Sequence, residues 1–238
     1  MPETIVCLGD SITRGLVSAN YIHLLERRLN GSGATFINAG INNDLTYNML
    51  QRIDKVIDAN PDVVTILAGT NDVIASLGPD KAAFFAAAKR LPQYPRLEWA
   101  WHNLLEIIHQ LKTHTHARIG VLSIPLLGEN PLTMPARRVQ KYNTGLKHIA
   151  YSERVHYLPL YEALLQELQD AGIVVGKAYT GSTMRTLEFA FRRLFGEDYD
   201  EFSLRRGFTL TVDGVHLNNV GAGVAADLIE RFLLEKPA

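Results

Sequence analysis

The chain of 238 residues has a formal net charge of −1, and its 47% hydrophobic and 21% charged residues are typical of a globular protein. It carries no basic tract, which argues against nucleic-acid binding. It also lacks the basic start of a signal peptide and the roughly 18 apolar residues of a membrane span. Its one cysteine excludes an internal disulfide. We therefore expect a soluble, cytoplasmic protein with no stable membrane insertion.

Short apolar runs alternate with helical patterns along the chain. Strands are predicted at about 4–8, 34–38, 63–67, 118–124 and 155–158. Helices are predicted at about 18–29, 44–59, 96–113 and 219–235, with two more that end near residues 151 and 171. Alternation of this kind is typical of a parallel sheet with helices on both faces. The expected fold is thus a three-layer α/β/α domain of about five strands.

Two stretches depart from this rhythm. Residues 73–95 contain alanine-rich helical pieces interrupted by glycine and proline. Residues 172–210, here called the insertion segment, contain no pattern of a core strand, although Ser182 could cap a helix with an apolar face that ends at Gly196. We expect a single domain over residues 1–238, with the insertion segment serving as a lid, an interface or a packed addition.

Distinctive polar blocks follow three of the predicted strands, and a fourth lies near the C-terminus. They are Gly9-Asp10-Ser11, Asn38-Ala39-Gly40, Gly69-Thr70-Asn71-Asp72 and Asp213-Gly214-Val215-His216. Open α/β sheets bind ligands at the carboxyl ends of their strands. Ser11, at the turn between the first strand and the next helix, is therefore predicted to be presented at that edge.

In these four blocks the sequence resembles the SGNH hydrolases of the GDSL esterase/lipase family, named for a serine, a glycine, an asparagine and a histidine. The matching residues are Ser11, Gly40, Asn71 and His216. The resemblance implies a flavodoxin-like α/β/α fold. It covers the chain from the first strand to the last helix, except for the insertion segment and residues 73–95. Ile12 replaces the leucine of the family name, and Ile41-Asn42-Asn43-Asp44 replaces a commoner glycine-containing turn.

A hydrolase of this kind needs an activated nucleophile and donors for an oxyanion. Ser11 is the predicted nucleophile, His216 its general base, and Asp213 the residue that orients the imidazole. The predicted oxyanion donors are the Ser11 and Gly40 backbone N–H groups and the Asn71 side-chain amide. Taken singly, each of Ser11, Gly40, Asn71 and His216 is explained as well by a turn, a cap or a structural hydrogen bond. Taken together, these four residues favour catalysis. No cofactor or metal is expected.

Other candidates have simpler explanations. Capping explains Asp10 and Asp72 better than acid–base chemistry does. His114 and His116 form a His-x-His turn without a third ligand nearby, which favours a solvated turn over a zinc site. The following side chains would line a substrate rim or acyl wall, or pack in the core: Tyr94, Trp99, Trp101, Leu126, Leu127, Phe189 and Phe191.

The leading hypothesis is a serine-dependent carboxylic ester hydrolase that forms an acyl-enzyme with a small-molecule ester. An apolar insertion segment over the site weakly favours a lysophospholipid; a thioester or an O-acetylated sugar remains open. A flavodoxin-like nucleotide-binding domain is disfavoured, because Asp10 would repel a phosphate. A non-catalytic interaction domain using the insertion segment is disfavoured by the intact four blocks. The oligomeric state is left open.

Overall fold

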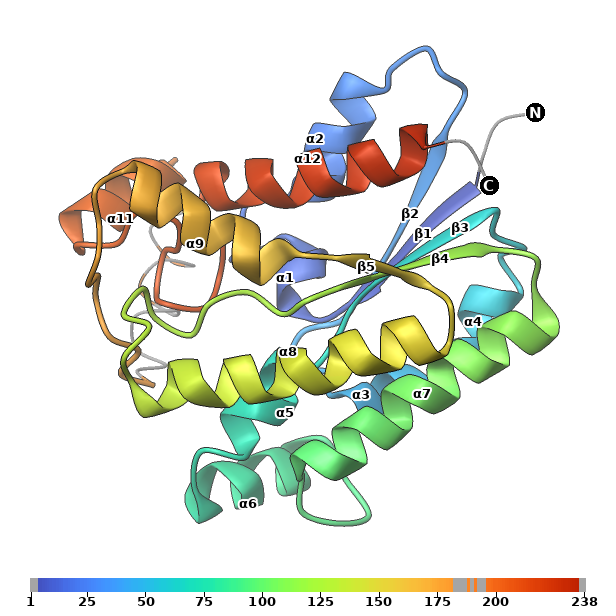
Figure 1. Cartoon of the computed structure of the whole chain (residues 1–238), viewed down its shortest axis with the longest axis horizontal. Coiled ribbons are helices and arrows are strands. Elements are labelled where there is room, and N and C mark those ends of the chain that lie inside the picture. The colour runs from blue at the N-terminus through green and yellow to red at the C-terminus, as the bar shows by residue number, and fades with distance from the viewer. Residues whose placement is uncertain (1–3, 182–187, 189–190, 192–195, 236–238) are drawn as a thin grey trace.

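The computed structural model describes residues 4–181, 188, 191 and 196–235 (Figure 1). Its centre is a parallel sheet of five strands in the order β2-β1-β3-β4-β5. The strands are β1 (Thr4–Gly9), β2 (Thr35–Gly40), β3 (Val63–Leu67), β4 (Arg118–Leu122) and β5 (His156–Leu158). The predicted three-layer α/β/α fold with a parallel sheet is confirmed.

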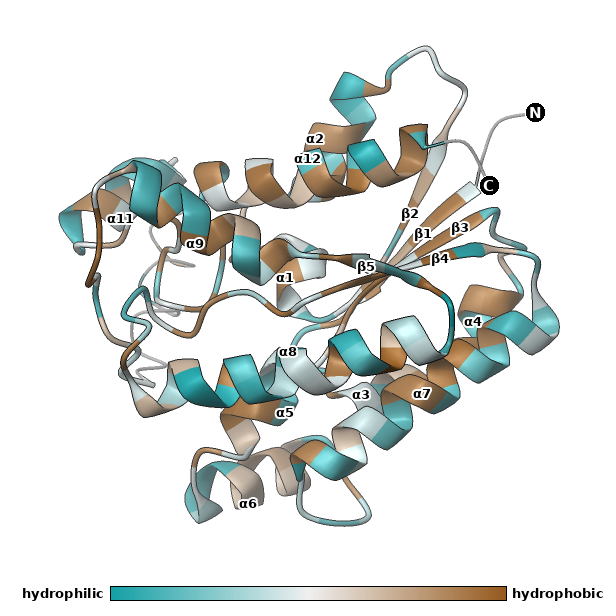
Figure 2. Ribbon diagram, in the orientation of Figure 1, coloured by the Kyte–Doolittle hydropathy of each residue, from teal (hydrophilic) through white to brown (hydrophobic). Residues whose placement is uncertain are grey.

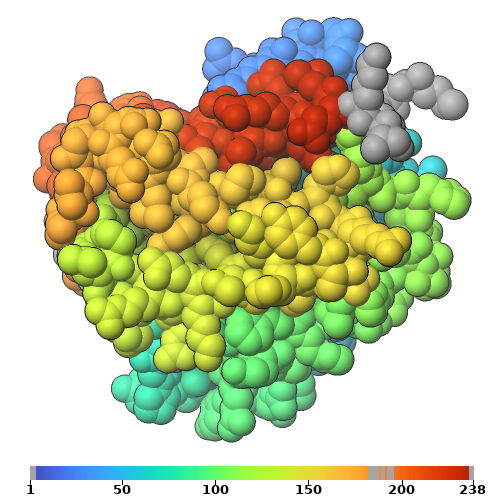
Figure 3. Space-filling model, viewed as in Figure 1, coloured from blue at the N-terminus to red at the C-terminus, as the bar shows by residue number. Residues whose placement is uncertain are grey.

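Helices cover both faces of the sheet (Figure 1). On one side lie α2 (Tyr21–Arg28), α9 (Leu160–Asp170) and α12 (Asn219–Leu234). On the other lie α3 (Thr46–Leu50), α4 (Ile53–Ile57), α7 (Leu97–His114) and α8 (Met134–Ser152). The central strands are mostly hydrophobic (Figure 2), and all five residues of β3 are buried. The face of the molecule seen in Figure 3 is formed largely by residues from the middle and the C-terminal half of the chain. Because helices flank the sheet on both sides (Figure 1), burial on both faces explains the apolar runs of the sequence.

The remaining helices are short and lie near the carboxyl ends of the strands or beside them. They are α1 (Ser11–Arg14), α5 (Thr70–Ala75), α6 (Pro79–Ala88) and α11 (Tyr199–Arg205). No helix in the described ranges is both long and apolar enough to cross a membrane.

Several predicted boundaries are wrong, among them the end of the fourth strand, which was expected at residue 124 and lies at Leu122. The single helix expected over 44–59 is two helices, α3 and α4, separated at Arg52, whose φ of −124° leaves the helical region. The second strand continues to Gly40, because residues 35–40 all pair with β1. The helix expected from about residue 18 begins at Tyr21 with Asn20 as its cap, and the Ser18 hydroxyl bonds the Leu217 backbone instead.

The insertion segment touches the rest of the chain in its described parts. Ala178 forms an isolated antiparallel bridge with Gly128, in the loop after β4. Helix α11 is capped by Asp198, whose side chain accepts from Asp200 and Glu201. The helix predicted to begin at Ser182 lies mostly outside the described residues, as does Phe189.

Candidate functional site

Ser11 is the first residue of the short helix α1, directly beyond the end of β1. Asp10 caps this helix, and its Oδ1 accepts a hydrogen bond from the Ile12 N–H at 2.9 Å. The turn is tight, since a Cβ on Gly9 would lie 2.0 Å from Thr13 Oγ1. Glycine is therefore required here, and the half-buried Ser11 is held at the carboxyl edge of the sheet as predicted.

The structure brings Ser11 together with the two residues predicted to assist it. Ser11 Oγ lies 2.9 Å from His216 Nε2, although the two residues are 205 positions apart in the chain. His216 Nδ1 lies 2.8 Å from Asp213 Oδ2. The other oxygen of Asp213 accepts the backbone N–H groups of Val215 and His216, both at 2.9 Å. A continuous hydrogen-bonded chain thus runs from a hydroxyl through an imidazole to a carboxylate.

The protonation state of His216 is set by opposing effects. Burial alone would lower its pKa, but the charge and hydrogen bond of Asp213, together with the charge of Asp10, raise it above the ordinary value. An ionised carboxylate only accepts hydrogen bonds, so Nδ1 carries a proton toward Asp213 and Nε2 is left to accept one from Ser11. This arrangement is able to take a proton from the Ser11 hydroxyl.

The loop that carries Asp213 and His216, residues 209–218, is closed on itself. The Val212 N–H donates to His216 O at 2.8 Å. At the end of the loop, Asn218 caps α12 through Gly221 N at 3.0 Å and donates back to Thr209 O at 2.8 Å. The position of the imidazole is thereby tied to the start of a long helix.

Gly40 lies at the end of β2, and its N–H donates to Asn38 Oδ1 at 2.9 Å, so an oxyanion would have to displace that contact to use this donor. A Cβ at this position would lie 2.3 Å from Arg14 N in α1. The glycine is explained by the close approach of β2 to α1.

Asn71 lies in the site, but its amide has partners. It is in the first turn of α5, whose cap is Gly69 with φ of 118°. Its Nδ2 donates to Asp44 O at 3.0 Å and lies 3.4 Å from Asp10 Oδ2. The second distance is beyond the usual range for an N–H···O hydrogen bond, so this contact is weak.

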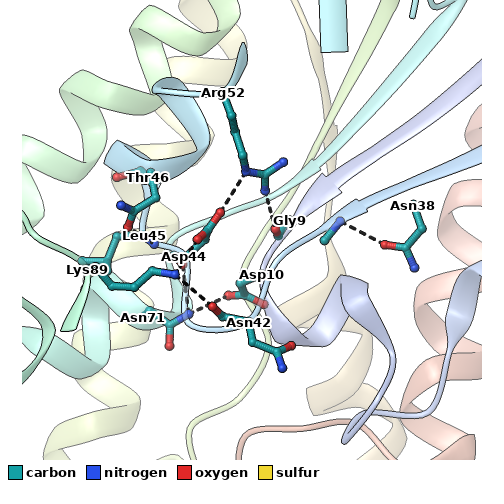
Figure 4. Close-up of polar contacts among 12 residues, drawn as sticks. Gly9, Asp10, Asn38, Asn42, Asp44, Leu45, Thr46, Arg52, Asn71 and Lys89 are labelled. Atoms are coloured by element: carbon teal, nitrogen blue, oxygen red, sulfur yellow. Dashed lines mark hydrogen bonds and ion pairs between the residues drawn. The ribbon is translucent and has the colours of Figure 1, made fainter. Parts of the chain in front are cut away.

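A largely buried ion-pair network surrounds Asp44 and links the loop between β2 and α3 to the polar blocks at Gly9 and Asn71 (Figure 4). The Asp44 carboxylate lies 2.9 Å from Arg52 Nε and 2.8 Å from Lys89 Nζ. Arg52 also donates to Gly9 O at 3.1 Å, and Lys89 donates to Asn42 O at 3.1 Å. The loop between β2 and α3 is thus tied to the end of β1 and, through Asp44 O, to Asn71.

Comparison with known proteins assigns the family. The sequence profile of the GDSL-like lipase/acylhydrolase family matches residues 7–173. The chain belongs to this family. It is therefore an ester-hydrolysing enzyme by membership, and the resemblance noted in its polar blocks is confirmed. No curated protein sequence matches it.

Solved structures share the fold of this GDSL-like protein. A catalytic mutant of Axe2, an acetylxylan esterase from Geobacillus stearothermophilus, has a TM-score of 0.71 at 18% identity, covering 98% of this chain and 95% of that chain. The acetyl xylan esterase AlAXEase has a TM-score of 0.65 at 19% identity, covering 97% of this chain and all of that chain. At such identities the likeness concerns the fold.

In this GDSL-like chain, Arg52 and Glu129 were not predicted from the sequence. Arg52 occupies a position of the apolar stripe between Met49 and Val56, and a charged residue on such a stripe is a signal of an internal partner. Glu129 is a lone carboxylate that ends the otherwise apolar and glycine-containing stretch after β4, and it is 2% exposed. Neither feature of the sequence identifies the residue with which the side chain interacts.

Several of the secondary candidates have structural contacts, whereas Tyr94 and Phe191 are exposed rather than packed in the core. Burial raises the pKa of Asp72 to about 6, and its carboxylate bonds Thr46 at the start of α3. Trp101 stacks on Tyr142 and donates to its carbonyl at 3.1 Å. Leu126 and Leu127 are buried in the core. Among the described residues no cluster of three potential metal-binding side chains includes His114 or His116.

Proposed function

We propose that this protein is a serine-dependent carboxylic ester hydrolase that acts through an acyl-enzyme. The observation that carries the proposal is the hydrogen-bonded chain from Ser11 through His216 to Asp213, with distances of 2.9 and 2.8 Å. These three groups are the nucleophile, base and orienting acid of acyl-transfer chemistry.

The reaction follows from this geometry. Ser11 Oγ attacks the ester carbonyl carbon while its proton passes to His216 Nε2. Collapse of the tetrahedral intermediate breaks the bond to the alcohol oxygen, which leaves with the proton from His216. Water then attacks the acyl-enzyme and gives a proton to His216. Collapse of the second intermediate breaks the bond between the acyl carbon and Ser11 Oγ, which takes that proton back from His216, and the carboxylic acid is released. Asp213 stabilises the imidazolium in both halves.

The oxyanion of each intermediate needs donors already in place. The Ser11 N–H has no acceptor among the described residues, so it is open to the substrate. Asn71 supplies a second donor, because its N–H toward Asp10 makes only a weak contact of 3.4 Å. Removing one such donor typically costs about 10²- to 10³-fold in kcat.

The substrate we propose is an O-acetylated sugar. Both similar structures described above are acetylxylan esterases, and each likeness covers nearly the whole chain. The weak preference for a lysophospholipid rested on an apolar insertion segment, of which residues 182–187 lie outside the described part. Lysophospholipid and thioester hydrolysis are therefore alternatives for the experiment to decide.

The test compares Ser11→Ala with the wild type on p-nitrophenyl esters of increasing acyl length. We expect Ser11→Ala to lower kcat by roughly 10⁴-fold or more and to abolish labelling by a fluorophosphonate, with the fold intact by circular dichroism. Ser152→Ala, at the exposed end of α8, is the matched control. Undiminished turnover or labelling in Ser11→Ala would overturn the mechanism.

The substrate class is tested separately with the wild-type protein. Acetate release from acetylated xylo-oligosaccharides should exceed fatty-acid release from a lysophospholipid and cleavage of an acyl thioester at equal concentrations. Faster release of fatty acid, or faster thioester cleavage, would replace the sugar-ester proposal without touching the serine mechanism.

A further inference from the structure

Glu129 is a buried carboxylate outside the hydrogen-bonded chain of the candidate site. It lies in the loop after β4 and is 2% exposed. Its Oε2 accepts the Thr209 N–H at 2.7 Å. Its Oε1 accepts the Leu210 N–H at 2.8 Å, and the Thr211 N–H and hydroxyl at 3.0 and 2.9 Å. Four donors from three consecutive residues thus converge on one carboxylate.

These contacts fix a piece of chain that belongs to no helix or strand and whose regular pairing is limited to the isolated bridge between Thr211 and Leu217. Buried backbone N–H groups need acceptors, and the Glu129 carboxylate provides them for residues 209–211. Hydrogen bonds to an ionised acceptor are roughly twice as strong as those between neutral groups. Because all three N–H groups must point at one carboxylate, the segment is restricted to one conformation.

The segment held in this way leads directly into Asp213. The neighbour of Glu129, Gly128, donates its N–H to Gly214 O at 2.7 Å, on the far side of Asp213. A Cβ on Gly128 would lie 2.2 Å from Tyr179 N, so glycine is needed where this loop packs against residues 177–179. Two adjacent residues of one loop therefore hold the chain both before and after Asp213.

We propose that Glu129 is a positioning residue for ester hydrolysis, which fixes residues 209–211 so that Asp213 and His216 are presented to Ser11. This inference rests on the proposed function. Glu129 touches none of the reacting groups and acts only through the backbone of the loop. Since acyl transfer depends on a general base within hydrogen-bond reach, a displacement of about 1 Å is enough to cost roughly 10²-fold.

Glu129→Gln isolates this role, because glutamine has the same shape but turns one acceptor oxygen into an NH₂ group that faces N–H donors. The matched control is Glu162→Gln, which changes a carboxylate that accepts Ser123 Oγ and Tyr157 OH away from the loop. Thr211→Val removes one of the four donors and keeps the three N–H groups.

Glu129→Gln should lower kcat for p-nitrophenyl acetate by about 10- to 100-fold with little change in KM, and should slow fluorophosphonate labelling by the same factor. Thr211→Val should show a smaller loss, and Glu162→Gln none. A variant that unfolds at lower temperature but keeps the wild-type kcat well below its Tm would overturn the proposal, because Glu129 would then be only a stabilising residue.

A second measurement does not need activity. The proton on His216 Nδ1, held by Asp213, is expected to give a low-field proton resonance in the wild type. Glu129→Gln should broaden or shift it, whereas an unchanged resonance would overturn the positioning role. If the wild type hydrolyses no ester, the proposed function fails, and this resonance still decides whether Glu129 positions the His216–Asp213 pair.

Discussion

Replacing Arg52 by methionine tests whether the Asp44 network supports the site. The Arg52 side chain is 13% exposed and Asp44 only 4%, so the pair is largely removed from water. Arg52 also donates to Gly9 O at the end of β1. Methionine keeps much of the apolar length of the side chain but leaves the Asp44 carboxylate with Lys89 as its remaining cation.

The expected decrease in the free energy of unfolding follows from these contacts. Removing one partner of a buried ion pair costs about 3–5 kcal/mol when the other charge is left alone. Lys89, 2.8 Å from Asp44, reduces this penalty, and Gly9 O still accepts from the Ile41 N–H at 3.2 Å. We therefore expect Arg52→Met to lower the free energy of unfolding by about 2–3 kcal/mol, which corresponds to roughly 5–10 °C in Tm for a chain of this size.

We expect Arg52→Met to lower the activity of the site as well. The loop that carries Asp44 presents its carbonyl to Asn71 Nδ2 at 3.0 Å. If the loop relaxes, Asn71 loses its orientation, and kcat for p-nitrophenyl acetate should fall by about 10-fold. Arg52→Lys keeps the charge but not the planar fork that reaches both Asp44 and Gly9, so we expect an intermediate effect.

Urea unfolding and steady-state kinetics measure the two effects, with Arg27→Met on the exposed face of α2 as the matched control. Combining Arg52→Met with Asp44→Asn gives a double-mutant cycle, for which we expect a coupling energy of about 1–3 kcal/mol. The reasoning is refuted if Arg52→Met matches Arg27→Met within about 0.5 kcal/mol, or if the cycle is additive.

Two further predictions concern ionisation. Asp213→Asn removes the charge that raises the pKa of His216 and leaves the burial that lowers it, so the pKa from an NMR titration of this ring should fall; an unchanged titration would contradict the assigned cause. Burial raises the pKa of Asp10 from 3.8 to about 6, so the folded state holds this proton more tightly than the unfolded chain. The stability that Asp10 contributes is therefore present below pH 3.8 and is lost as the pH rises through about 6. The side chain at position 10 no longer titrates in Asp10→Asn. In urea titrations, the free energy of unfolding of this variant relative to the wild type should therefore rise by roughly 3 kcal/mol over that pH interval. Parallel curves of unfolding free energy against pH for the two proteins would rule this out.

The strands could be predicted because parallel strands buried on both faces read as apolar runs. The run at 63–67 matches β3 residue for residue, and the run at 4–8 falls one residue short of the end of β1. The helix over 44–59 was wrong for an identifiable reason. Periodicity describes an isolated helix, whereas Arg52 leaves the helical conformation at a point where its side chain bonds Asp44 and Gly9.

The candidate site was predicted unevenly. Ser11, His216 and Asp213 stand in distinctive blocks, and the structure places all three within hydrogen-bond reach. The oxyanion role predicted for Gly40 stays a prediction, and its N–H is bonded to Asn38 in the structure. Glu129 was not predicted at all, because its partners at residues 209–211 lie about 80 positions further along the chain.

The sequence by itself determined the alternation of strands and helices and the kinds of chemical group that follow the strands. Both are local properties, which hydrophobic periodicity and short polar blocks reveal. Only the tertiary structure decided the strand order, the closure of Ser11 on His216, and which backbone N–H groups stay open to a ligand. Each of these depends on pairs of groups far apart in the chain, and a hydrogen bond between such groups leaves no periodic trace in the sequence.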